Sequence, residues 1–272
     1  MFIFRKGERL IDGIFFTGSN GTGSKIAELA GKRLIRTQLE LGGKDGVYVH
    51  DDVSIDYAAE NVAEGVLYNN GQGCCSIERV YVNEKIYEKF LERVVHFAKQ
   101  WKLGNPFSAD TNLGPLTRPQ QAKILDQQVA DAVEKGAKVL LGGKATHVDS
   151  LNGVYYEPTL VANCNSSMLI MQDESFGPIA GIQSISGDVN AIVDALNDCK
   201  YGLTNAVYSK DPNVAHSILS KVNSGTVYWN ACDRVSPQLP WSGRKGSGVG
   251  STLGIPGILA FVQPKAYHYK RV

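Results

Sequence analysis

Strand-like and helix-like patterns alternate from one end of this sequence to the other, and this alternation constrains the fold more than any other feature. The segment 77–82 alternates in the manner of a strand, and the segment 84–102 repeats its apolar residues at the spacing of an amphipathic helix. A second clear helix is predicted for 119–135, where Gly136 follows as a natural stop. Alternating elements of this kind favour an α/β fold with a mostly parallel sheet.

The remaining elements continue the same alternation. A glycine-rich turn is predicted for 18–23. The end of the chain, 258–269, has a strand-like pattern without a neighbouring partner, and an unpaired terminal strand favours pairing with another subunit. Further strands are predicted at 11–17, 37–41, 46–50, 139–141, 155–161, 179–185, 206–209 and 226–229, and further helices at 25–34, 54–68, 190–197 and 214–222.

Composition and charge narrow the functional class. The 272 residues are enough for one large domain or two smaller ones, and 43% hydrophobic with 20% charged residues is typical of soluble globular proteins. A net charge of +1 gives no electrostatic reason to expect nucleic acid or an anionic membrane as a partner. No apolar stretch approaches the roughly 20 residues of a membrane span, and the N-terminal MFIF is too short for a signal peptide. Five cysteines, two of them adjacent, indicate reduced thiols, so we expect the cytoplasm or another reducing compartment.

Two glycine-rich segments near the N-terminus have the character of ligand-binding loops. FTGSNGTG, residues 16–23, offers backbone N–H groups and a helix N-terminus to an anion such as a pyrophosphate. Its glycine order differs from the common dinucleotide fingerprint, and a plain turn explains it as well. LELGGK, residues 39–44, places Glu40 at a strand end before two glycines, where an apolar setting would make it a general base. A surface glutamate paired with a lysine is the alternative.

Two later segments carry a thiol and an acidic pair. NNGQGCCS, residues 69–76, would expose Cys74 after a sharp turn, beside backbone amides that lower a thiol's pKa and stabilise an oxyanion. Adjacent cysteines also suit a protein core, because cysteine is among the most buried residues. DESFGP, residues 173–178, joins carboxylates that can hold ribose hydroxyls to an aromatic that can pack against a flat ring. An exposed turn with a buried phenylalanine fits the same letters.

Taken together and in this order, the four segments resemble the aldehyde dehydrogenase superfamily. FTGSNGTG is similar to its phosphate-binding turn, LELGGK to its general-base motif, NNGQGCCS to its G-Q-x-C nucleophile motif and ESFGP to its nicotinamide-ribose motif. YGLT at 201–204 and LPWSGRKGSGVG at 239–250 also resemble family segments. The resemblance therefore runs from about Ile14 to the C-terminus, and it implies the aldehyde-dehydrogenase-like α/β fold.

The resemblance assigns roles to individual residues. Cys74 takes the place of the nucleophile, and Glu40 that of the general base. Glu174 takes the place of the ribose contact, and Phe176 that of the aromatic beside the nicotinamide. Trp241 falls where family members place an aromatic in the substrate tunnel. No metal site is implied. The phosphate-binding turn and its flank supply the remaining cofactor-binding residues, Gly18, Ser19, Gly23 and Leu41.

The reaction implied by the resemblance is the NAD- or NADP-dependent oxidation of a small-molecule aldehyde to a carboxylic acid. The Cys74 thiolate attacks the aldehyde carbon to give a thiohemiacetal, and loss of hydride to the nicotinamide leaves a thioester. A water activated by Glu40 then hydrolyses the thioester. One thiol and one carboxylate thus serve as the covalent and proton-transfer groups.

The resemblance covers only the C-terminal portion of a family subunit. It implies a remnant of a Rossmann-like dinucleotide-binding domain at 1–43, a catalytic domain at 44–246 and a tail with an oligomerisation strand at 247–272. The family's oxyanion-hole asparagine and its lysine for the adenine ribose have no counterpart here. We therefore expect weak cofactor binding, little activity from this chain alone and a homo-oligomer formed through the terminal strand.

Two other interpretations use the same residues. A non-catalytic or complementing subunit would dock on another chain through the terminal strand. A cysteine-dependent esterase would use Cys74 and Glu40 to hydrolyse an activated ester without a cofactor. Dinucleotide binding separates the dehydrogenase from both alternatives.

Overall fold

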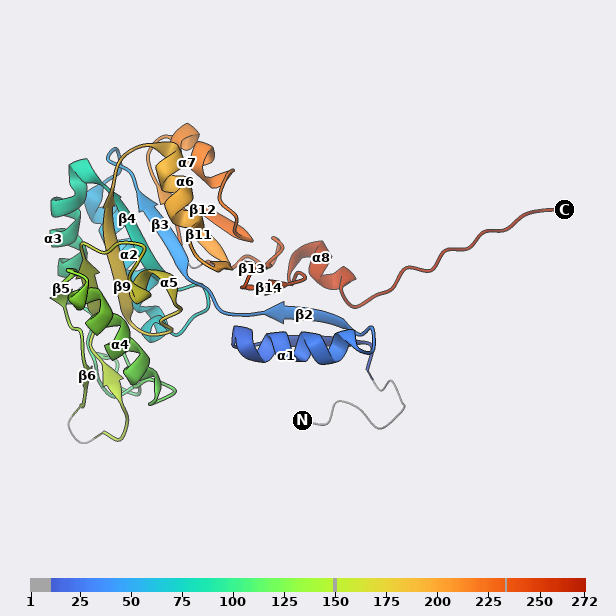
Figure 1. Cartoon of the computed structure of the whole chain (residues 1–272), viewed down its shortest axis with the longest axis horizontal. Coiled ribbons are helices and arrows are strands. Elements are labelled where there is room, and N and C mark those ends of the chain that lie inside the picture. Colours follow the sequence, from blue (N-terminus) through green and yellow to red (C-terminus); the bar gives the residue numbers. More distant parts are fainter. Residues whose placement is uncertain (1–10, 149–150, 233) are drawn as a thin grey trace.

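A seven-stranded sheet forms the centre of the computed structural model, which describes residues 11–148, 151–232 and 234–272 (Figure 1). Its strands stand in the order β12-β11-β3-β4-β9-β8-β5, and all neighbours are parallel except β8 and β5. The mostly parallel sheet predicted from the alternating pattern is thereby confirmed. The strands are β3 (Asp45–Val49), β4 (Ile77–Asn83), β5 (Lys138–Leu141), β8 (Thr159–Ala162), β9 (Ile179–Ile185), β11 (Thr204–Tyr208) and β12 (Thr226–Trp229).

Helices cover both faces of this sheet, so most of its strand residues are buried. In β3, Val47 and Val49 join the core on one face, whereas Tyr48 joins the core on the other, because successive side chains of a strand point in opposite directions. Burial on both faces explains why apolar residues can follow one another in these strands, as Val47, Tyr48 and Val49 do in β3. The first face is covered by α2 (Ile55–Leu67) and α3 (Tyr87–Ala98), and the second by α4 (Gln121–Glu134), α5 (Leu169–Gln172), α6 (Val189–Asn197) and α7 (Pro212–Leu219).

A smaller unit lies beside the large sheet and carries the N-terminal motifs (Figure 1). Strands β1 (Gly13–Thr17) and β2 (Arg36–Glu40) pair in parallel, and helix α1 (Asn20–Gly31) packs on them. Strand β14 (Gly248–Val249), from near the C-terminus, pairs antiparallel with β2. The chain then passes from β2 into β3 of the large sheet, so the LELGGK segment joins the two units.

The shortest strands and helices leave the weakest pattern in the sequence. The predicted strand 155–161 is divided in two, because Pro158 has no N–H to donate to a strand ladder. No helix within the described ranges is long and apolar enough to cross a membrane. The remaining elements are β6 (Ala145–Thr146) paired with β7 (Tyr155–Tyr156), β10 (Tyr201–Gly202) paired with β13 (Arg244–Lys245), α8 (Gly254–Leu259) and the 3₁₀ turns η1 (Tyr68–Gly71) and η2 (Glu84–Ile86).

The predicted turn at 18–23 is shorter than expected. Helix α1 begins at Asn20 because Ser19 serves as its N-cap, with Oγ accepting a hydrogen bond from the Thr22 amide at 3.4 Å. Gly21 and Gly23 therefore lie inside the helix. Only the two residues before Asn20 remain outside regular structure between β1 and α1.

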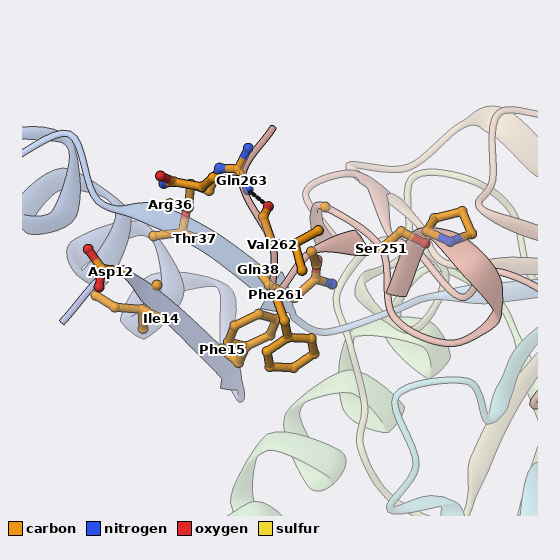
Figure 2. Close-up of a pocket in the computed structure, with 14 residues that line it drawn as sticks. Asp12, Ile14, Phe15, Arg36, Thr37, Gln38, Ser251, Phe261, Val262 and Gln263 are labelled. Atoms are coloured by element: carbon orange, nitrogen blue, oxygen red, sulfur yellow. Dashed lines mark hydrogen bonds between the residues drawn. The ribbon is translucent and has the colours of Figure 1, made fainter. Parts of the chain in front are cut away.

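The predicted terminal strand at 258–269 is wrong for this chain by itself. Its first residues belong to α8, and the residues after α8 form neither helix nor strand and are exposed from Phe261 onward (Figure 1). A strand needs partners for its backbone N–H and C=O groups, and none of the described strands pairs with this tail. The start of the tail is held by the stack of Phe261 on Phe15 and by the Arg36 guanidinium, which donates to the Val262 carbonyl at 2.8 Å (Figure 2).

Candidate active site

Glu40 is the last residue of β2, and its backbone is held from two sides. Thr17 of β1 pairs with it in parallel register, and Gly248 of β14 pairs with it in antiparallel register. Its side chain is only 8% exposed. Burial raises the pKa of Glu40 to about 7, and weaker interactions with the Trp241 and Gln38 side chains partly oppose this rise. A carboxyl group with such a pKa can accept a proton from water near neutral pH.

The alternative of a surface glutamate paired with the nearby lysine is wrong. Lys44 is fully buried and pairs with Glu78, whose carboxylate lies 2.6 Å from the Lys44 ammonium group. Glu40 is buried as well, so it is not a surface glutamate.

The turn before Cys74 has an unusual backbone. Asn69 and Asn70 have φ angles of 53° and 61°, in the left-handed region that asparagine tolerates better than most residues. The side chain of Asn70 is anchored, because its amide donates to the Gly114 carbonyl oxygen. The sharp turn predicted for NNGQGCCS is present, and it delivers Cys74 in a half-buried position just before β4.

The two adjacent cysteines differ in their surroundings. Cys75 is buried in a small apolar cluster with Leu203 and Trp241, and Cys74 packs against that cluster. A hydrogen bond from the Cys75 side chain lowers the pKa of Cys74, while burial and the negative charges of Glu40 and Glu174 oppose the shift. The core interpretation of the pair thus fits Cys75, and Cys74 has the lowered pKa expected of a reactive thiol.

Because Gly42 and Gly43 have no side chains, three of the motifs can contact one another at these residues. A Cβ at Gly43 would collide with the Cys74 carbonyl oxygen, and a Cβ at Gly42 would collide with the Glu174 carboxylate. The Gly43 amide donates to Oε1 of Glu174 at 3.0 Å. Burial, followed by repulsion from Glu78, raises the pKa of Glu174 to about 7. The LELGGK, G-Q-x-C and ESFGP segments therefore form one site around two glycines.

A buried polar network fixes the loop that carries Glu174. The Glu78 carboxylate accepts hydrogen bonds from the backbone amides of Ser175 at 2.8 Å and Phe176 at 2.9 Å, in addition to the Lys44 ammonium. The Ser175 hydroxyl donates to the Gln128 side chain at 2.6 Å. Phe176 is exposed and has a φ of 47°, so the alternative of a buried phenylalanine in this turn is wrong.

Sequence reasoning missed this network, although the sequence holds a signal for it. Glu78 and Arg79 are charged, yet they stand inside a strand whose other residues are apolar or polar without charge. Charged residues in such a strand must find partners when buried. Arg79 does so by donating to the backbone carbonyls of Lys44, Ala195 and Leu196.

Asp45 links LELGGK to the YGLT segment. Its carboxylate accepts hydrogen bonds from the Thr204 amide at 3.0 Å and from the Thr204 hydroxyl at 2.6 Å. Burial raises the pKa of Asp45 well above its ordinary range. Through its hydrogen bonds to Thr204, the aspartate ties β3 to β11.

The remaining cofactor-binding candidates lie in the smaller unit. The Gly18 amide donates to the Glu40 carbonyl at 3.1 Å, and Ser19 caps the adjoining helix α1. Gly23 packs against the Leu41 side chain, where a Cβ would collide with it. Leu41 donates its amide to the Ser247 carbonyl at 2.9 Å. The N-terminus of α1 therefore lies next to the end of β2 that carries Glu40, with backbone N–H groups of the kind that receive an anion.

One cavity of the molecule does not contain these groups. It measures about 810 Å³ and lies between the edge of the smaller sheet and the C-terminal segment, with Phe15, Gln38, Gly250 and Phe261 among its walls (Figure 2). Neither Cys74 nor the two acidic candidates line it. Within the described residues, no cluster of three histidine, cysteine, aspartate or glutamate side chains could hold a metal ion.

Fold and site together define an α/β protein in which a thiol of lowered pKa and a carboxyl group of raised pKa share one partly buried site. The sequence profile of the aldehyde dehydrogenase family matches residues 7–267. The chain belongs to the aldehyde dehydrogenase family.

Relatives and solved structures agree with this assignment. The chain is 37% identical over 256 residues to betaine aldehyde dehydrogenase of Bacillus subtilis (strain 168), covering 94% of this chain and 52% of the relative. It is 37% identical over 262 residues to retinal dehydrogenase 2 of Gallus gallus, covering 96% of this chain and 50% of the relative. The chain therefore spans about half the length of the curated relatives it matches.

Two crystal structures have a closely similar fold. Betaine aldehyde dehydrogenase from Staphylococcus aureus in complex with NAD+ superposes with a TM-score of 0.88 at 34% identity, over 92% of this chain and 50% of that one. Lactaldehyde dehydrogenase from Escherichia coli superposes with a TM-score of 0.88 at 34% identity, over 93% of this chain and 52% of that one. The predicted aldehyde-dehydrogenase-like fold is confirmed.

Proposed function

We propose that this chain supplies the nucleophile and the general base for the oxidation of an aldehyde to a carboxylic acid. One observation carries the proposal: Trp241 packs in the apolar cluster next to Cys74 and also interacts with the Glu40 carboxylate. The thiol and the base therefore share one aromatic neighbour, which suits a substrate carbonyl lying between them. Family membership supports the oxidoreductase class.

Cys74 performs the covalent step. Its thiolate attacks the aldehyde carbon, and the carbonyl oxygen becomes an oxyanion that the Cys74 backbone amide can stabilise. The hydrogen bond from Cys75 lowers the pKa of Cys74 and so favours its thiolate form. The thiohemiacetal oxyanion becomes a thioester when it loses a hydride, which carries two electrons and one proton. A nicotinamide dinucleotide bound beside the site would supply the electron acceptor.

Glu40 performs the hydrolytic step. In its ionised form it takes a proton from a water molecule, and that water attacks the thioester carbon. The carbon–sulfur bond then breaks, the carboxylic acid leaves and the Cys74 thiolate is regenerated. Because the pKa of Glu40 is raised to about 7, the fraction of ionised base, and with it the rate of this step, increases through neutral pH.

Glu174 and Phe176 are proposed to hold the nicotinamide-ribose end of NAD or NADP, and Gly18 and Ser19 the pyrophosphate. Glu174 is fixed by Gly43, and Phe176 presents an exposed ring from a fixed loop. We expect binding to be weak in this chain, because the described cofactor unit offers one three-stranded sheet and one helix N-terminus. The aromatic Trp241 would line the path of the aldehyde.

The test compares the chain alone with the chain mixed with the N-terminal portion of a relative such as the Bacillus subtilis enzyme. Each sample receives an aldehyde and NAD or NADP, and mass spectrometry measures acyl adducts on Cys74 while absorbance measures the reduced cofactor. The mixture should form the adduct, and a Glu40→Gln variant should accumulate it after a burst of reduced cofactor. The chain alone should turn over little or not at all. No adduct in either sample, or an unchanged steady-state rate in the Glu40→Gln variant, would refute the proposal.

The esterase alternative uses the same pair of groups, because the charge of Glu40 acts on the Cys74 thiol. It predicts that 4-nitrophenyl acetate acylates Cys74 and that the acyl group is hydrolysed at a Glu40-dependent rate. Turnover of the ester without any nucleotide binding in calorimetry would favour the esterase over the dehydrogenase. A complementing subunit without catalysis predicts neither reaction.

We also propose that the chain forms a homo-oligomer through its C-terminal tail. The tail protrudes from the molecule and carries exposed Tyr267 and Tyr269, whose rings stack on each other (Figure 1). Strand β12 is an edge of the large sheet and exposes part of Trp229. A tail from a second copy could pair with such an edge and become a strand. A catalytic thiol suits a reducing compartment, which supports the cytoplasm as the location.

A further inference from the structure

We propose that Gln38 is a positioning residue for Glu40. The side-chain amide of Gln38 binds one oxygen of the Glu40 carboxylate and leaves the other oxygen to accept the proton of the attacking water. The inference rests on the proposed role of Glu40 as the general base. The C-terminal segment 248–250 then also helps to position Glu40, because it lies against the Gln38 side chain.

The two side chains share one side of β2. Gln38 and Glu40 are two residues apart in a strand, so both point to the same face. They are 6% and 8% exposed, and the Gln38 amide donates to Oε1 of Glu40 at 3.3 Å. Oε2 is buried too, yet it accepts no hydrogen bond from the residues that the structure describes. A buried acceptor without a donor is costly and is common at functional sites, so Oε2 is the atom left for water.

The C-terminal segment pairs with β2 and lies against the Gln38 side chain. Val249 pairs with Leu39 and Gly248 with Glu40 in the antiparallel register. Gly250 has a φ of 90°, and a Cβ there would collide with Oε1 of Gln38, so only a glycine lets the amide lie against the backbone. Figure 2 shows Gln38 on β2 and Ser251, the residue after Gly250, and both line the cavity of about 810 Å³.

The hydrogen bond has a defined electrostatic effect. A donor to a carboxylate stabilises its charged form, so the Gln38 amide holds the pKa of Glu40 below the value that burial alone would give. The Trp241 side chain also favours the charged form of Glu40 but gives Oε2 no hydrogen bond, and the charge of Glu40 acts on the Cys74 thiol. Loss of the Gln38 donor should raise the pKa of Glu40 by about half a unit to one unit, a modest shift because 3.3 Å is a long hydrogen bond.

The direct test is an NMR titration of the chain carrying ¹³C-labelled glutamate, with the Glu40 signal assigned by its loss in a Glu40→Gln variant. Gln38→Leu should raise the pKa of Glu40 as stated. Gln38→Glu keeps the shape of the side chain, and its second carboxylate should raise the upper pKa of the pair still further. A matched control is Asn83→Leu, which removes a buried amide with a 3.3 Å hydrogen bond to Tyr48 at the far end of β4. That control should leave the Glu40 titration in place.

A second readout follows the hydrolysis of an acyl group placed on Cys74 by 4-nitrophenyl acetate. The pH midpoint of deacylation should move upward in Gln38→Leu by the same amount as the pKa of Glu40, whereas a purely structural defect would lower the rate without moving the midpoint. An unchanged Glu40 pKa in both folded Gln38 variants would overturn the inference. A raised pKa with a deacylation rate that ignores Glu40 would instead confirm the Gln38 contact and remove Glu40 from the mechanism, so the two failures are distinguishable.

Discussion

Breaking the buried ion pair between Lys44 and Glu78 should destabilise the protein far more than breaking an exposed one. The two charged groups lie 2.6 Å apart with side chains 0% and 3% exposed. The Glu78→Ala variant leaves the Lys44 ammonium buried without its partner and leaves the Ser175 and Phe176 amides without an acceptor. Both losses act inside the protein, where water cannot compensate them.

The expected magnitude is about 4 kcal/mol. Removing one member of a buried pair typically costs about 3–5 kcal/mol, and an unsatisfied buried amide costs about 1–3 kcal/mol. The two penalties overlap, because burial already lowers the pKa of Lys44 and the lone lysine can release its proton. At about 2–4 °C per kcal/mol for a chain of this size class, the midpoint of thermal unfolding should fall by on the order of 10 °C.

The assay is thermal unfolding followed by circular dichroism, with urea unfolding as a second measure. Glu28→Ala is the control, because its ion pair with Lys32 has a similar length of 2.7 Å but both side chains are 65% exposed. Such a surface pair contributes little to stability, because water and salt screen it. Equal midpoints for the Glu78→Ala and Glu28→Ala variants would refute the reasoning that the buried network fixes the Glu174 loop.

Four further outcomes are expected. Iodoacetamide should label Cys74 fastest near pH 7, as followed by peptide mass spectrometry, while Cys164 should react slowest because burial raises its pKa to about 12; equal labelling of the cysteines would contradict this. Gly43→Ala should slow that labelling and lower the thermal midpoint, because its Cβ collides with the Cys74 carbonyl; an unaffected variant would show that the loop can yield. The pKa of Glu40 is about 7 in the folded state against an ordinary 4.5, so the folded state binds more protons and the protein loses stability as pH rises between these values. The Glu40→Gln variant should lose less stability over that pH range, as measured by urea unfolding. The same dependence of stability on pH in both proteins would argue against the raised pKa. Truncation after Leu259 should lower the sedimentation coefficient if the tail links copies, and no change would count against that role.

The sequence by itself determined the large sheet, its helices and the motifs of the site. Strand β12 has the predicted bounds, and α2 begins one residue after the predicted start because Ser54 occupies the N-cap position. Periodicity is a local property, since one or two turns of helix or a few strand residues suffice to show which face is apolar. The candidate residues Glu40, Cys74 and Glu174 came from motif order, and the structure brings them together around Gly42 and Gly43. Their catalytic roles stay predictions.

Only the tertiary structure decided which polar groups meet and whether they are buried. Lys44 pairs with Glu78, which is 34 residues away in the sequence, and the Gly43 amide binds Glu174, which is 131 residues away. No sequence pattern specifies a contact between residues so far apart in the chain. The raised pKa of Glu40 likewise depends on burial, which is created by elements from both ends of the chain. The tail shows the converse case: its sequence suits a strand, but a strand forms only where another strand satisfies its backbone hydrogen bonds, and a single chain offers this tail no such neighbour among the described strands.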